Sequence, residues 1–492
     1  MAEHPPNPLV GPHAETPTAE KRICIIGAGA GGLATLKVLK ETEQAQSGLW
    51  KLTAFEERQA IGGVWLPAPP EQNPPLTPLY DVLTTNLPHL IMGYPSFPFP
   101  PSTPLFPSAA IVLKYLQDYA AHFDLLRHVR PNTRVEEARW NASEQVWKVT
   151  LSTGELSDFD FIVVANGHYR KPRYPNTQGL QKWIASGRAI HSAWFRRASD
   201  HAQYKKVLVA GGGPSGLDIS TEMRTVSQLV LHSVPSDAFP SDFAPPPNTD
   251  SYRKVPKVKE YKDNGDVVFA DGTIESNVEF AILGTGYEVS FPFLPQSTLG
   301  VPNFPPPLPS HLYNSTYHIF PLAKHLFPLQ SDFPAHTIAF PALPQRVAPF
   351  PISEDQARAI ARVLTEPSAL DVAAEAVAIV ERARALAKEE GTDDPLQLAK
   401  AWSRFGPREP FEYRAELHAF AKPGTEWRAP DWEVEFWDRK DALRAEWKEV
   451  VKSGQAGEWV KGVGERGVQE WVDLCRRLLK RRDDREKQQA KL

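Results

Sequence analysis

The chain has 492 residues, of which 41% are hydrophobic and 23% charged, and this is typical of a globular protein of two or three domains. The formal net charge of −4 and the lack of an apolar run of roughly 18 to 20 residues give no support for nucleic acid as the main partner or for a membrane span. The two cysteines, Cys24 and Cys475, belong to no CxxC motif or Cys/His cluster, which argues against a disulfide framework, a metal site or a dithiol reductase and fits a reducing compartment.

A tail precedes the first predicted element. Residues 1–20 are rich in Pro, Glu and Ala and lack an apolar stretch, which indicates a disordered tail rather than a signal peptide. The apolar run Lys21–Ile26 then predicts a strand, and the amphipathic segment 33–40 predicts a helix. Between them stands a G-x-G-x-x-G string of six candidate dinucleotide contacts: Gly27, Ala28, Gly29, Ala30, Gly31 and Gly32.

The glycines of this string each have a physical role. The first permits a tight turn, the second lets backbone amides approach a pyrophosphate, and the third allows close packing of helix on strand. The helix N-terminus also favours the anionic phosphates. The next predicted strand, residues 51–55, ends on Glu56, and a carboxylate there can bind both hydroxyls of an adenosine ribose and would repel a phosphorylated ribose. The first site therefore suits FAD or NAD rather than NADP.

The same pattern recurs further along the chain. Lys206–Ala210 predicts a strand and residues 217–224 predict a helix. The candidate contacts of this second site are Gly211, Gly213, Pro214, Ser215, Gly216, Leu217 and Asp218. The following predicted strand, residues 229–233, ends without a carboxylate, which is compatible with the 2′-phosphate of NADP. Basic residues come only later, at Arg253 and Lys254, and we expect NADPH rather than NADH here.

The two units predict an α/β fold with two Rossmann-like dinucleotide-binding domains and a C-terminal helical layer. We expect the NADPH-binding domain, residues 183–290, to be inserted in the FAD-binding domain, residues 21–182 and 291–365. The 48 prolines gather in stretches that cannot be helix interiors or central strands. These stretches predict irregular connections packed on the scaffold: residues 67–107, 235–247 and 292–351.

The last part of the chain, residues 366–492, is predicted to be helical. Ahead of it, Ser353–Gln356 has the form of a capping box and predicts a helix start. A period near 3.6 in residues 369–388 predicts another helix. We expect the later tryptophans in the core of this layer: Trp402, Trp427, Trp432, Trp437, Trp447, Trp459 and Trp471. Residues 476–492 carry eight Lys and Arg against three Asp and Glu, which favours a solvated final helix, with contact to a membrane surface as the alternative.

Four further motifs carry a family resemblance. Ile61-Gly62-Gly63-Val64-Trp65 follows Glu56, and residues 80–100 contain an Asn-bearing loop followed by Phe-Pro-Phe-Pro. Residues 187–195 have the pattern G-x-x-x-H-x-x-x-F, and residues 283–287 are Leu-Gly-Thr-Gly-Tyr. Together these motifs resemble those of the flavin-containing monooxygenases over roughly residues 21–365.

The sequence departs from the family pattern at several positions. The leading Phe of the F-x-G-x-x-x-H-x-x-x-Y/F signature is Ala185, its last position is Phe195, and the linker begins with Leu283 and Gly284 rather than Phe-Ala. The hydrophobic C-terminal anchor of vertebrate members is missing. Phe195 in place of Trp favours the branch that oxidises nitrogen and sulfur over the Baeyer–Villiger relatives.

The resemblance implies FAD and NADPH as cofactors. It also implies oxygenation, with O2, of a soft nitrogen or sulfur nucleophile in a small molecule through a C4a-(hydro)peroxyflavin. Val64, Trp65, Thr85 and Asn86 are the cofactor contacts that it implies. Asn86 is the candidate catalytic residue, because an amide both donates and accepts hydrogen bonds, here with the flavin peroxide and the nicotinamide. The alternative is an Asn that caps a turn before Pro88.

Other roles stay open within the resemblance. His191 serves either in nucleotide binding or in domain packing. Thr285 and Gly286 are expected to form a hinge and backbone at the flavin edge. The helix that opens at Ser353 is similar to the family helix whose N-terminus faces the pyrimidine edge of the flavin, and an ordinary surface helix is the alternative.

Two rival functions accompany the preferred one. The first is a Baeyer–Villiger or N-hydroxylating monooxygenase with the same cofactors, and the second is a flavin-binding regulatory protein without turnover. We expect a cytoplasmic enzyme that has no metal ion, no nucleic-acid partner and no transmembrane segment, and the sequence is compatible with a homodimer.

Overall fold

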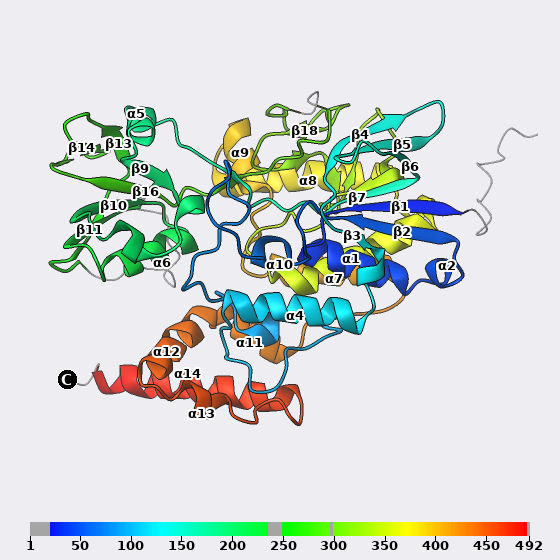
Figure 1. The fold of residues 1–492 in the computed structure, drawn as a ribbon. Coiled ribbons are helices and arrows are strands. Elements are labelled where there is room, and N and C mark those ends of the chain that lie inside the picture. Colours follow the sequence, from blue (N-terminus) through cyan, green and yellow to red (C-terminus); the bar gives the residue numbers. More distant parts are fainter. Residues whose placement is uncertain (1–19, 235–247, 296–298, 490–492) are drawn as a thin grey trace, which may run out of the picture.

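The computed structural model describes residues 20–234, 248–295 and 299–489. Two five-stranded parallel sheets lie side by side, and the last four helices of the chain lie beneath them (Figure 1). The expected disordered tail, apart from Glu20, and the proline stretch 235–247 fall outside the described residues.

The first sheet defines what we call the first domain. Its strand order is β22-β7-β1-β2-β3 with parallel pairs throughout. The central strand β1 carries four consecutive buried residues, 23–26, because a strand covered on both faces needs an apolar run. The bounds are β1 Lys21–Ile26, β2 Trp50–Phe55, β3 Val129–Arg130, β7 Phe161–Val164 and β22 Ile338–Ala339.

The second sheet defines the second domain and repeats this topology. Its order is β12-β11-β10-β16-β9, again with parallel pairs. The bounds are β9 Ala189–His191, β10 Lys206–Ala210, β11 Leu229–Ser233, β12 Tyr252–Val255 and β16 Phe280–Leu283. The chain leaves the first sheet after β7 and returns to it at β22, so the second domain is inserted in the first. The predicted α/β fold with two Rossmann-like domains is confirmed.

Smaller sheets complete both domains. The strands are β4 Val135–Asn141, β5 Val146–Leu151 and β6 Leu156–Phe159 in one sheet and β13 Val258–Tyr261, β14 Val267–Phe269 and β15 Ile274–Glu275 in another. Three antiparallel two-stranded pairs are β8 Lys171–Pro172 with β17 Tyr287–Glu288, β18 Tyr313–Asn314 with β19 Ile319–Phe320, and β20 Leu322–Ala323 with β21 Phe327–Pro328. The β8–β17 pair joins the two connections that run between the domains.

The helix α5, Leu180–Ala185, belongs to the second domain. Its residues Leu180 and Trp183 are buried in a core cluster with Leu208 of β10 and Ala281 of β16. The domain boundary expected between residues 182 and 183 therefore falls inside this helix.

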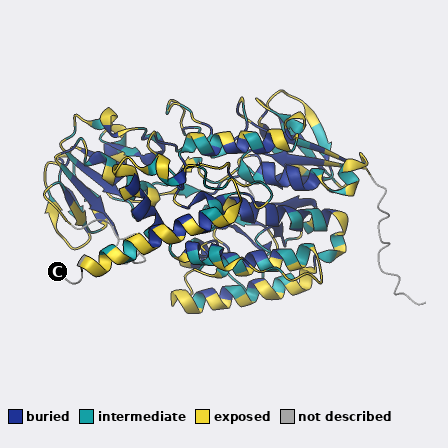
Figure 2. Cartoon of the chain, turned by 90° about the horizontal axis from the view of Figure 1, so that it is seen from below, coloured by how far each residue is buried: buried dark blue, intermediate teal, exposed yellow. Residues whose placement is uncertain are grey.

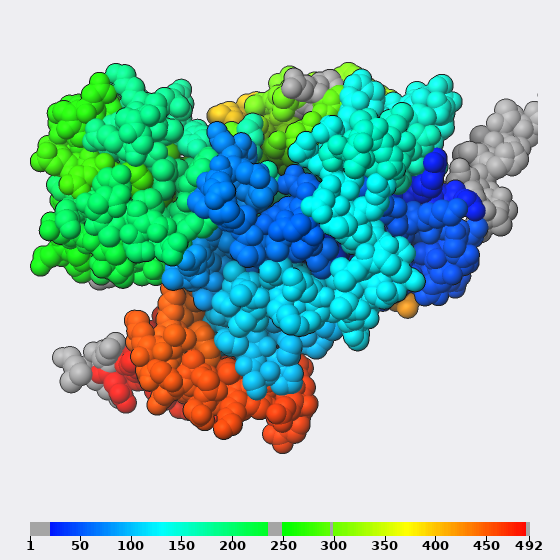
Figure 3. Space-filling model, viewed as in Figure 1, coloured from blue at the N-terminus to red at the C-terminus, as the bar shows by residue number. Residues whose placement is uncertain are grey.

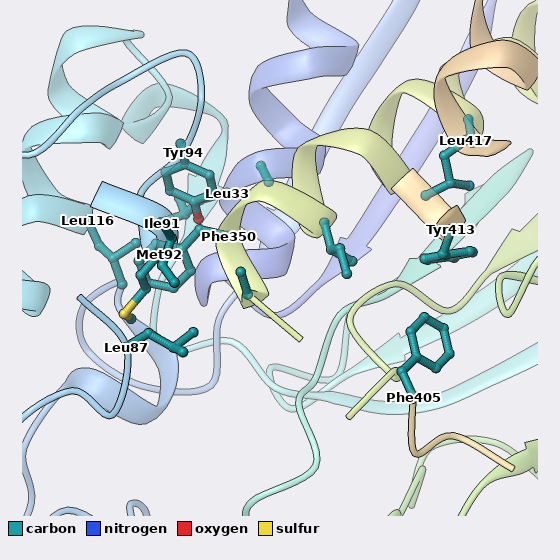
Figure 4. Packing of buried hydrophobic residues seen from close by; sticks show 14 of the residues in the cluster. Leu33, Leu87, Ile91, Met92, Tyr94, Leu116, Phe350, Phe405, Tyr413 and Leu417 are labelled. Atoms are coloured by element: carbon teal, nitrogen blue, oxygen red, sulfur yellow. The ribbon is translucent and has the colours of Figure 1, made fainter. Parts of the chain in front are cut away.

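The remaining α-helices before residue 395 pack on the sheets and on one another. They are α1 Ala30–Lys40, α2 Glu43–Gln46, α3 His89–Met92, α4 Ala109–His122, α6 Pro214–Met223, α7 Pro349–Thr365 and α8 Val372–Glu390. α1 and α7 pack on each other, and aromatic and aliphatic side chains from residues 87–94 and α10 extend this core (Figure 4).

The expected start of α7 at a Ser353 capping box is wrong. The helix begins one turn earlier at Pro349, with Ala348 as its N-cap, and Pro351 also lies inside it. Proline is tolerated in the first turn because the N–H that it lacks has no partner there. Ser353 is instead buried inside the helix, and its hydroxyl donates to the carbonyl of Pro349 at 2.7 Å.

The C-terminal region, residues 395–489, is helical as expected. Its helices are α9 Pro395–Ala401, α10 Glu409–Ala421, α11 Asp431–Asp438, α12 Lys440–Lys452, α13 Ala456–Val460 and α14 Val468–Gln489. Trp402, Trp437, Trp447 and Trp471 are buried, whereas the other three tryptophans of the set are half-buried. Among the described helices, none is long and apolar enough to cross a bilayer.

The basic end of the chain has partners inside the molecule. α14 exposes one side to solvent along its length (Figure 2). Arg481 and Arg485 pair with Glu446, a fully buried carboxylate of α12, at 3.2 and 2.5 Å. Arg476 pairs with Glu435 at 2.8 Å. A buried carboxylate needs such counter-charges, so part of the basic character of this end serves the packing of α12.

Candidate functional site

The first glycine turn connects β1 to α1 and has no room for side chains. Gly27 has φ +101°, and a Cβ there would lie 2.6 Å from the carbonyl oxygen of Ala165. A Cβ on Gly32 would lie 2.0 Å from the carbonyl oxygen of Gly27. Gly29 is the N-cap of α1 and provides no side-chain cap, so the first N–H groups of the helix stay open to an anion.

Glu56 follows β2 at the side of this turn. Its carboxylate accepts hydrogen bonds from the backbone N–H of Ala28 at 2.9 Å and of Arg58 at 3.0 Å. Burial raises the pKa of Glu56, and the two backbone hydrogen bonds act against this rise. Each carboxylate oxygen keeps a second lone pair, so the group remains able to accept hydrogen bonds from ribose hydroxyls.

A second backbone segment closes over the first turn. A Cβ on Gly29 would lie 3.3 Å from the Cα of Gly63, and the 3-10 turn Gly63–Trp65 places Val64 and Trp65 half-buried beside it. Arg58 holds this turn, because its Nη1 donates to the carbonyl of Gly63 at 3.2 Å and of Leu66 at 2.7 Å. The sequence patterns did not indicate this role of Arg58.

The Asn-bearing loop runs from the first domain toward the second. Thr85 is buried, and its hydroxyl donates to the carbonyl of Leu87 at 2.8 Å. Asn86 is exposed, and its side chain has no hydrogen-bond partner in the part of the chain that the structure describes. A turn-capping Asn accepts a hydrogen bond from a nearby backbone N–H. The geometry therefore leaves the amide of Asn86 free for a ligand.

The second glycine turn connects β10 to α6 with the same geometry. Gly211 has φ +130°, and a Cβ there would lie 2.1 Å from the carbonyl oxygen of Gly284. A Cβ on Gly216 would lie 2.0 Å from the carbonyl oxygen of Gly211. Gly213, the N-cap of α6, has no neighbour within 4 Å of such a position, so open space lies before the helix N-terminus.

His232 supports this second turn, and the sequence patterns gave it no role. It is fully buried, its Nε2 donates to the carbonyl of Gly211 at 2.8 Å, and its Nδ1 accepts from the hydroxyl of Tyr252 at 2.8 Å. Burial lowers the pKa of His232. The carbonyl of Gly211 can only accept, so Nε2 carries a hydrogen. A buried polar side chain near the end of a parallel strand is the signal that could have found it.

The other expected contacts of the second site are split. Pro214, Ser215 and Leu217 lie in the first turn of α6, next to the open space. Asp218 points elsewhere, because its carboxylate accepts a hydrogen bond from the hydroxyl of Tyr80 at 2.8 Å and pairs with Arg444 at 3.2 Å. The side chain of Asp218 therefore links α6 to Tyr80 of the first domain and to Arg444 of the C-terminal region.

The two basic candidates for a 2′-phosphate lie on the edge strand β12. Arg253 pairs with Glu275 at 2.8 Å. Lys254 is exposed, lies opposite His232 in the register of β11 and β12, and makes no ion pair within the described residues. Lys254 is thus the free cation of the two.

His191 joins the second signature to the linker between the domains. Its Nδ1 accepts from the backbone N–H of Ala193 at 3.1 Å, and its Nε2 donates to the carbonyl of Gly286 at 3.0 Å. The hydroxyl of Thr285 donates to the carbonyl of Arg173 at 2.6 Å. Burial lowers the pKa of His191 to about 4, so the ring is neutral at pH 7. These contacts favour the domain-packing role of His191.

A further segment approaches the first glycine turn. A Cβ on Gly31 would lie 3.2 Å from the Cβ of Ala342, and the backbone N–H of Ala342 donates to the side chain of Gln356 at 2.8 Å. Gln356 in turn donates to the hydroxyl of Tyr413 at 2.9 Å. The start of α7 and the C-terminal region therefore support the loop that borders the first site.

Both turns fit a dinucleotide. Each combines glycines that exclude side chains with an uncapped helix N-terminus, and the first adds a carboxylate at the end of its second strand. One chain with two such turns on two parallel sheets defines a protein that holds two dinucleotides.

The particular family follows from comparison with known proteins. The chain belongs to the flavin-binding monooxygenase-like family, whose model matches residues 20–239 and 251–394. It is therefore a monooxygenase, an oxidoreductase with FAD and NADP(H) as cofactors.

Several relatives carry functional names. A thiol-specific monooxygenase of Saccharomyces cerevisiae is 32% identical over 358 residues, which cover 70% of this chain and 77% of the yeast protein. The flavin-containing monooxygenase FMO GS-OX-like 7 of Arabidopsis thaliana is 31% identical and covers 72% of this chain and 75% of its own. The structure of S-allyl-L-cysteine S-oxygenase from Allium sativum is similar, with a TM-score of 0.71 and 25% identity, over 90% of this chain and 99% of that one.

Proposed function

We propose that this enzyme transfers one oxygen atom from O2 to a soft nucleophile of a small molecule, with sulfur of a thiol or thioether ahead of amine nitrogen. The observation that carries the proposal is the free, exposed amide of Asn86 on the loop between Tyr80, which is buried in the second domain, and Leu87, which is buried in the first. The similarity to a thiol-specific monooxygenase and to an S-oxygenase supports sulfur as the preferred atom.

The residues of the chain divide the work between the two domains. The N–H groups at the start of α1 and the carboxylate of Glu56 hold FAD in the first domain, with Val64 and Trp65 beside it. The start of α6 holds NADPH in the second domain. Bound flavin, once reduced by NADPH, supplies the activation of O2.

Asn86 acts at the reacting centre. Its N–H2 group would donate a hydrogen bond to oxygen activated by the bound flavin, and its carbonyl would accept one from the nicotinamide amide. A neutral amide adds no charge of its own next to a developing oxyanion, so it stabilises that charge more than an ionised side chain of the same size would.

A substrate panel tests the proposal. Purified, FAD-loaded enzyme is supplied with NADPH, 18O2 and, separately, small thiols, thioethers, primary amines, tertiary amines and ketones, and products are identified by mass spectrometry. We expect 18O in sulfoxides from the thioethers and in sulfenic acids from the thiols, trapped before a second thiol expels the labelled oxygen as water and forms the disulfide. Amine oxidation should be slower. Esters formed from ketones would instead establish the Baeyer–Villiger rival, and hydroxylated primary amines the N-hydroxylating rival.

We also propose a cytoplasmic location. Cys24 and Cys475 are both free and buried, and burial raises the pKa of both thiols, so they are unreactive and suit a reducing compartment. Cell fractionation tests the location. The homodimer stays a prediction, which light scattering of the purified protein tests.

A further inference from the structure

A segment of the first domain docks into the second domain at Tyr80. Tyr80 comes from the proline-rich connection, yet its ring is buried in the core cluster of the second domain. It packs edge-on against Phe195 at 6.1 Å, and the backbone N–H of Asp81 donates to the carbonyl of Arg196 at 2.9 Å. The two domains therefore meet here in addition to the β8–β17 linkers.

Asp218 of α6 contacts one residue of the first domain and one residue of the C-terminal region. The hydroxyl of Tyr80 donates to its Oδ2 at 2.8 Å, and Nη2 of Arg444 on α12 lies 3.2 Å from Oδ2 and 3.3 Å from Oδ1. The side chains of Asp218 and Arg444 are 17% and 11% exposed, so the ion pair is poorly screened by solvent. We call these three residues, Tyr80, Asp218 and Arg444, the clasp.

One helical turn beyond the Asp218–Arg444 pair, α6 again carries an acidic residue and α12 again carries a basic one. Glu222 follows Asp218 on α6, and Lys448 follows Arg444 on α12. Burial and the charge of Asp218 raise the pKa of Glu222, while the charge of Lys448 lowers it. The acidic face of α6 therefore lies toward the basic face of α12.

The C-terminal region that carries Arg444 is fixed to the first domain. Trp471 of α14 packs edge-on against His89, three residues after Asn86, with ring centroids 4.3 Å apart. The backbone N–H of Ser102 donates to the carbonyl of Val463 at 2.9 Å, and that of Gly462 donates to the hydroxyl of Ser102 at 2.9 Å. In Figure 3 this region, in orange, lies under the green second domain and the blue and cyan part of the first domain.

We propose that Arg444 is a positioning residue for the nicotinamide cofactor: through the clasp it holds α6, and with it the glycine turn of the second domain, at a fixed place relative to the first domain. Asp218 lies one turn inside α6, which begins at Pro214, so the open space before the helix N-terminus moves with the clasp. The matched range of the family model ends at residue 394, so this role belongs to a part of the chain beyond it.

The consequence concerns cofactor affinity. A cofactor that must bind one domain and reach the other binds only the arrangement in which the two are aligned. Its apparent dissociation constant rises as the aligned fraction falls. Loss of the clasp therefore weakens NADP(H) binding without changing any group that touches the cofactor. This inference depends on NADP(H) binding and not on the substrate proposed above.

A variant set with a matched control tests the clasp. The variants are Arg444→Gln, Asp218→Asn, their double variant, and Tyr80→Phe, which removes only a hydroxyl. The control is Arg439→Gln at the start of the same helix, whose guanidinium pairs with Asp483 inside the C-terminal region. The dissociation constant of NADP+ is measured by titration of FAD-loaded protein, and backbone hydrogen exchange is followed in residues 284–288 of the linker.

The clasp predicts a distinct pattern. Arg444→Gln and Asp218→Asn each raise the dissociation constant of NADP+ about three- to tenfold, Tyr80→Phe raises it about twofold, and the double variant resembles either single one. Exchange in the linker rises in the same variants, KM for NADPH rises more than kcat falls, and Arg439→Gln matches the wild type.

Two outcomes would overturn the proposal. If Asp218→Asn binds NADP+ as tightly as the wild type or more tightly, Arg444 merely neutralises a carboxylate near the phosphates. If Arg444→Gln and Tyr80→Phe both keep wild-type affinity and linker exchange, the contacts have no positioning effect. Neither result depends on which substrate is oxygenated, so failure of the clasp and failure of the proposed function remain distinguishable.

Discussion

At the scale of single residues, the surroundings of Asn86 favour a ligand-binding role over a structural one. Its side chain is exposed and without a partner among the described residues, although its neighbours Thr85 and Leu87 are buried. A polar side chain held on an ordered loop and left unpaired is available to a ligand at little entropic cost.

Replacement Asn86→Asp tests this residue. An ionised carboxylate donates no hydrogen bond and places negative charge next to a developing oxyanion. Loss of one placed donor costs about 2.7 to 4 kcal/mol, so oxygenated product should fall by roughly a hundredfold or more. FAD stays bound and NADPH is still oxidised, so H2O2 rises in place of product. A turn-capping role predicts otherwise, because Asp caps nearly as well as Asn, and the ratio of product to NADPH would then stay at the wild-type value.

Gly29 offers the sharpest steric test of the first site. A Cβ there would already lie 3.3 Å from the Cα of Gly63, and the two further methyl groups of valine would fill the space in front of the helix N-terminus. We expect Gly29→Val to yield colourless protein that takes up no added FAD, measured by absorbance at the flavin band. Gly457→Val is the matched control, because a Cβ on Gly457 meets nothing within 4 Å, and this variant should remain yellow.

At the scale of elements, the edge strand β12 carries two neighbouring basic residues that differ in their contacts. Arg253 is held by Glu275, whereas Lys254 is free within the described chain. Replacement Lys254→Ala should raise KM for NADPH by roughly fivefold, the effect of about 1 kcal/mol for an exposed charge pair, and leave KM for NADH unchanged. Arg253→Ala should have the smaller effect. Steady-state kinetics with both nucleotides decide this, and an equal rise with NADH would exclude a 2′-phosphate contact.

Helix α7 carries two buried carboxylates, those of Glu354 and Asp355. Asp355 is fully buried and pairs with Arg414 at 2.8 Å and with His418 at 2.8 Å, and Arg414 also pairs with Glu433. Burial acts to raise the pKa of Asp355, but the hydrogen bond from His418 and the charge of Arg414 outweigh it and hold this pKa below its ordinary value. The network joins α7 to α10 and α11.

Replacement Asp355→Asn should therefore destabilise the fold. Removal of one partner of a buried pair costs about 3 to 5 kcal/mol. Because the folded carboxylate has the lower pKa, its contribution is complete above the unfolded pKa of about 3.9 and is lost as pH falls through the folded value. The difference in free energy of unfolding between the two proteins, measured with urea at several pH values, should shrink in acid. The exposed pair of Asp431 with Arg428 supplies the control, and Asp431→Asn should change little.

The elements that sequence reasoning predicted correctly share a local signature. The strands Lys21–Ile26, Lys206–Ala210 and Leu229–Ser233 have the expected bounds, because a short apolar run specifies a buried parallel strand, and in the first two a glycine turn marks its end. The start of α7 was predicted one turn late, because S-x-x-Q has the form of a capping box, whereas Pro349 offers the preorganised first turn that the chain uses.

At the scale of the whole molecule, the contacts that assemble the site have no such signature. Tyr80 reaches α6, and Trp471 reaches His89, across long stretches of sequence. Neither partner is marked by periodicity or by a motif, because a buried aromatic residue looks the same in sequence whichever element it meets. The glycine turns and the place of Glu56 follow local patterns in the sequence. Arg58 and Arg444 follow none, since Arg58 contacts the backbone of an irregular turn and Arg444 contacts Asp218, which is 226 residues away in the chain.

The insertion of the second domain also sets the order in which the molecule can be completed during synthesis. β22, the edge strand of the first sheet, and α7, which covers α1, come after every strand of the second sheet. At about 5–20 residues per second, the interval between β7 and β22 lasts on the order of ten seconds. From the end of β16 onward the inserted domain has its full set of strands, while the side of α1 that α7 covers still lacks its partner. At that stage of synthesis the second domain can be complete while the first domain is not. We therefore expect chaperones to bind mainly the first domain.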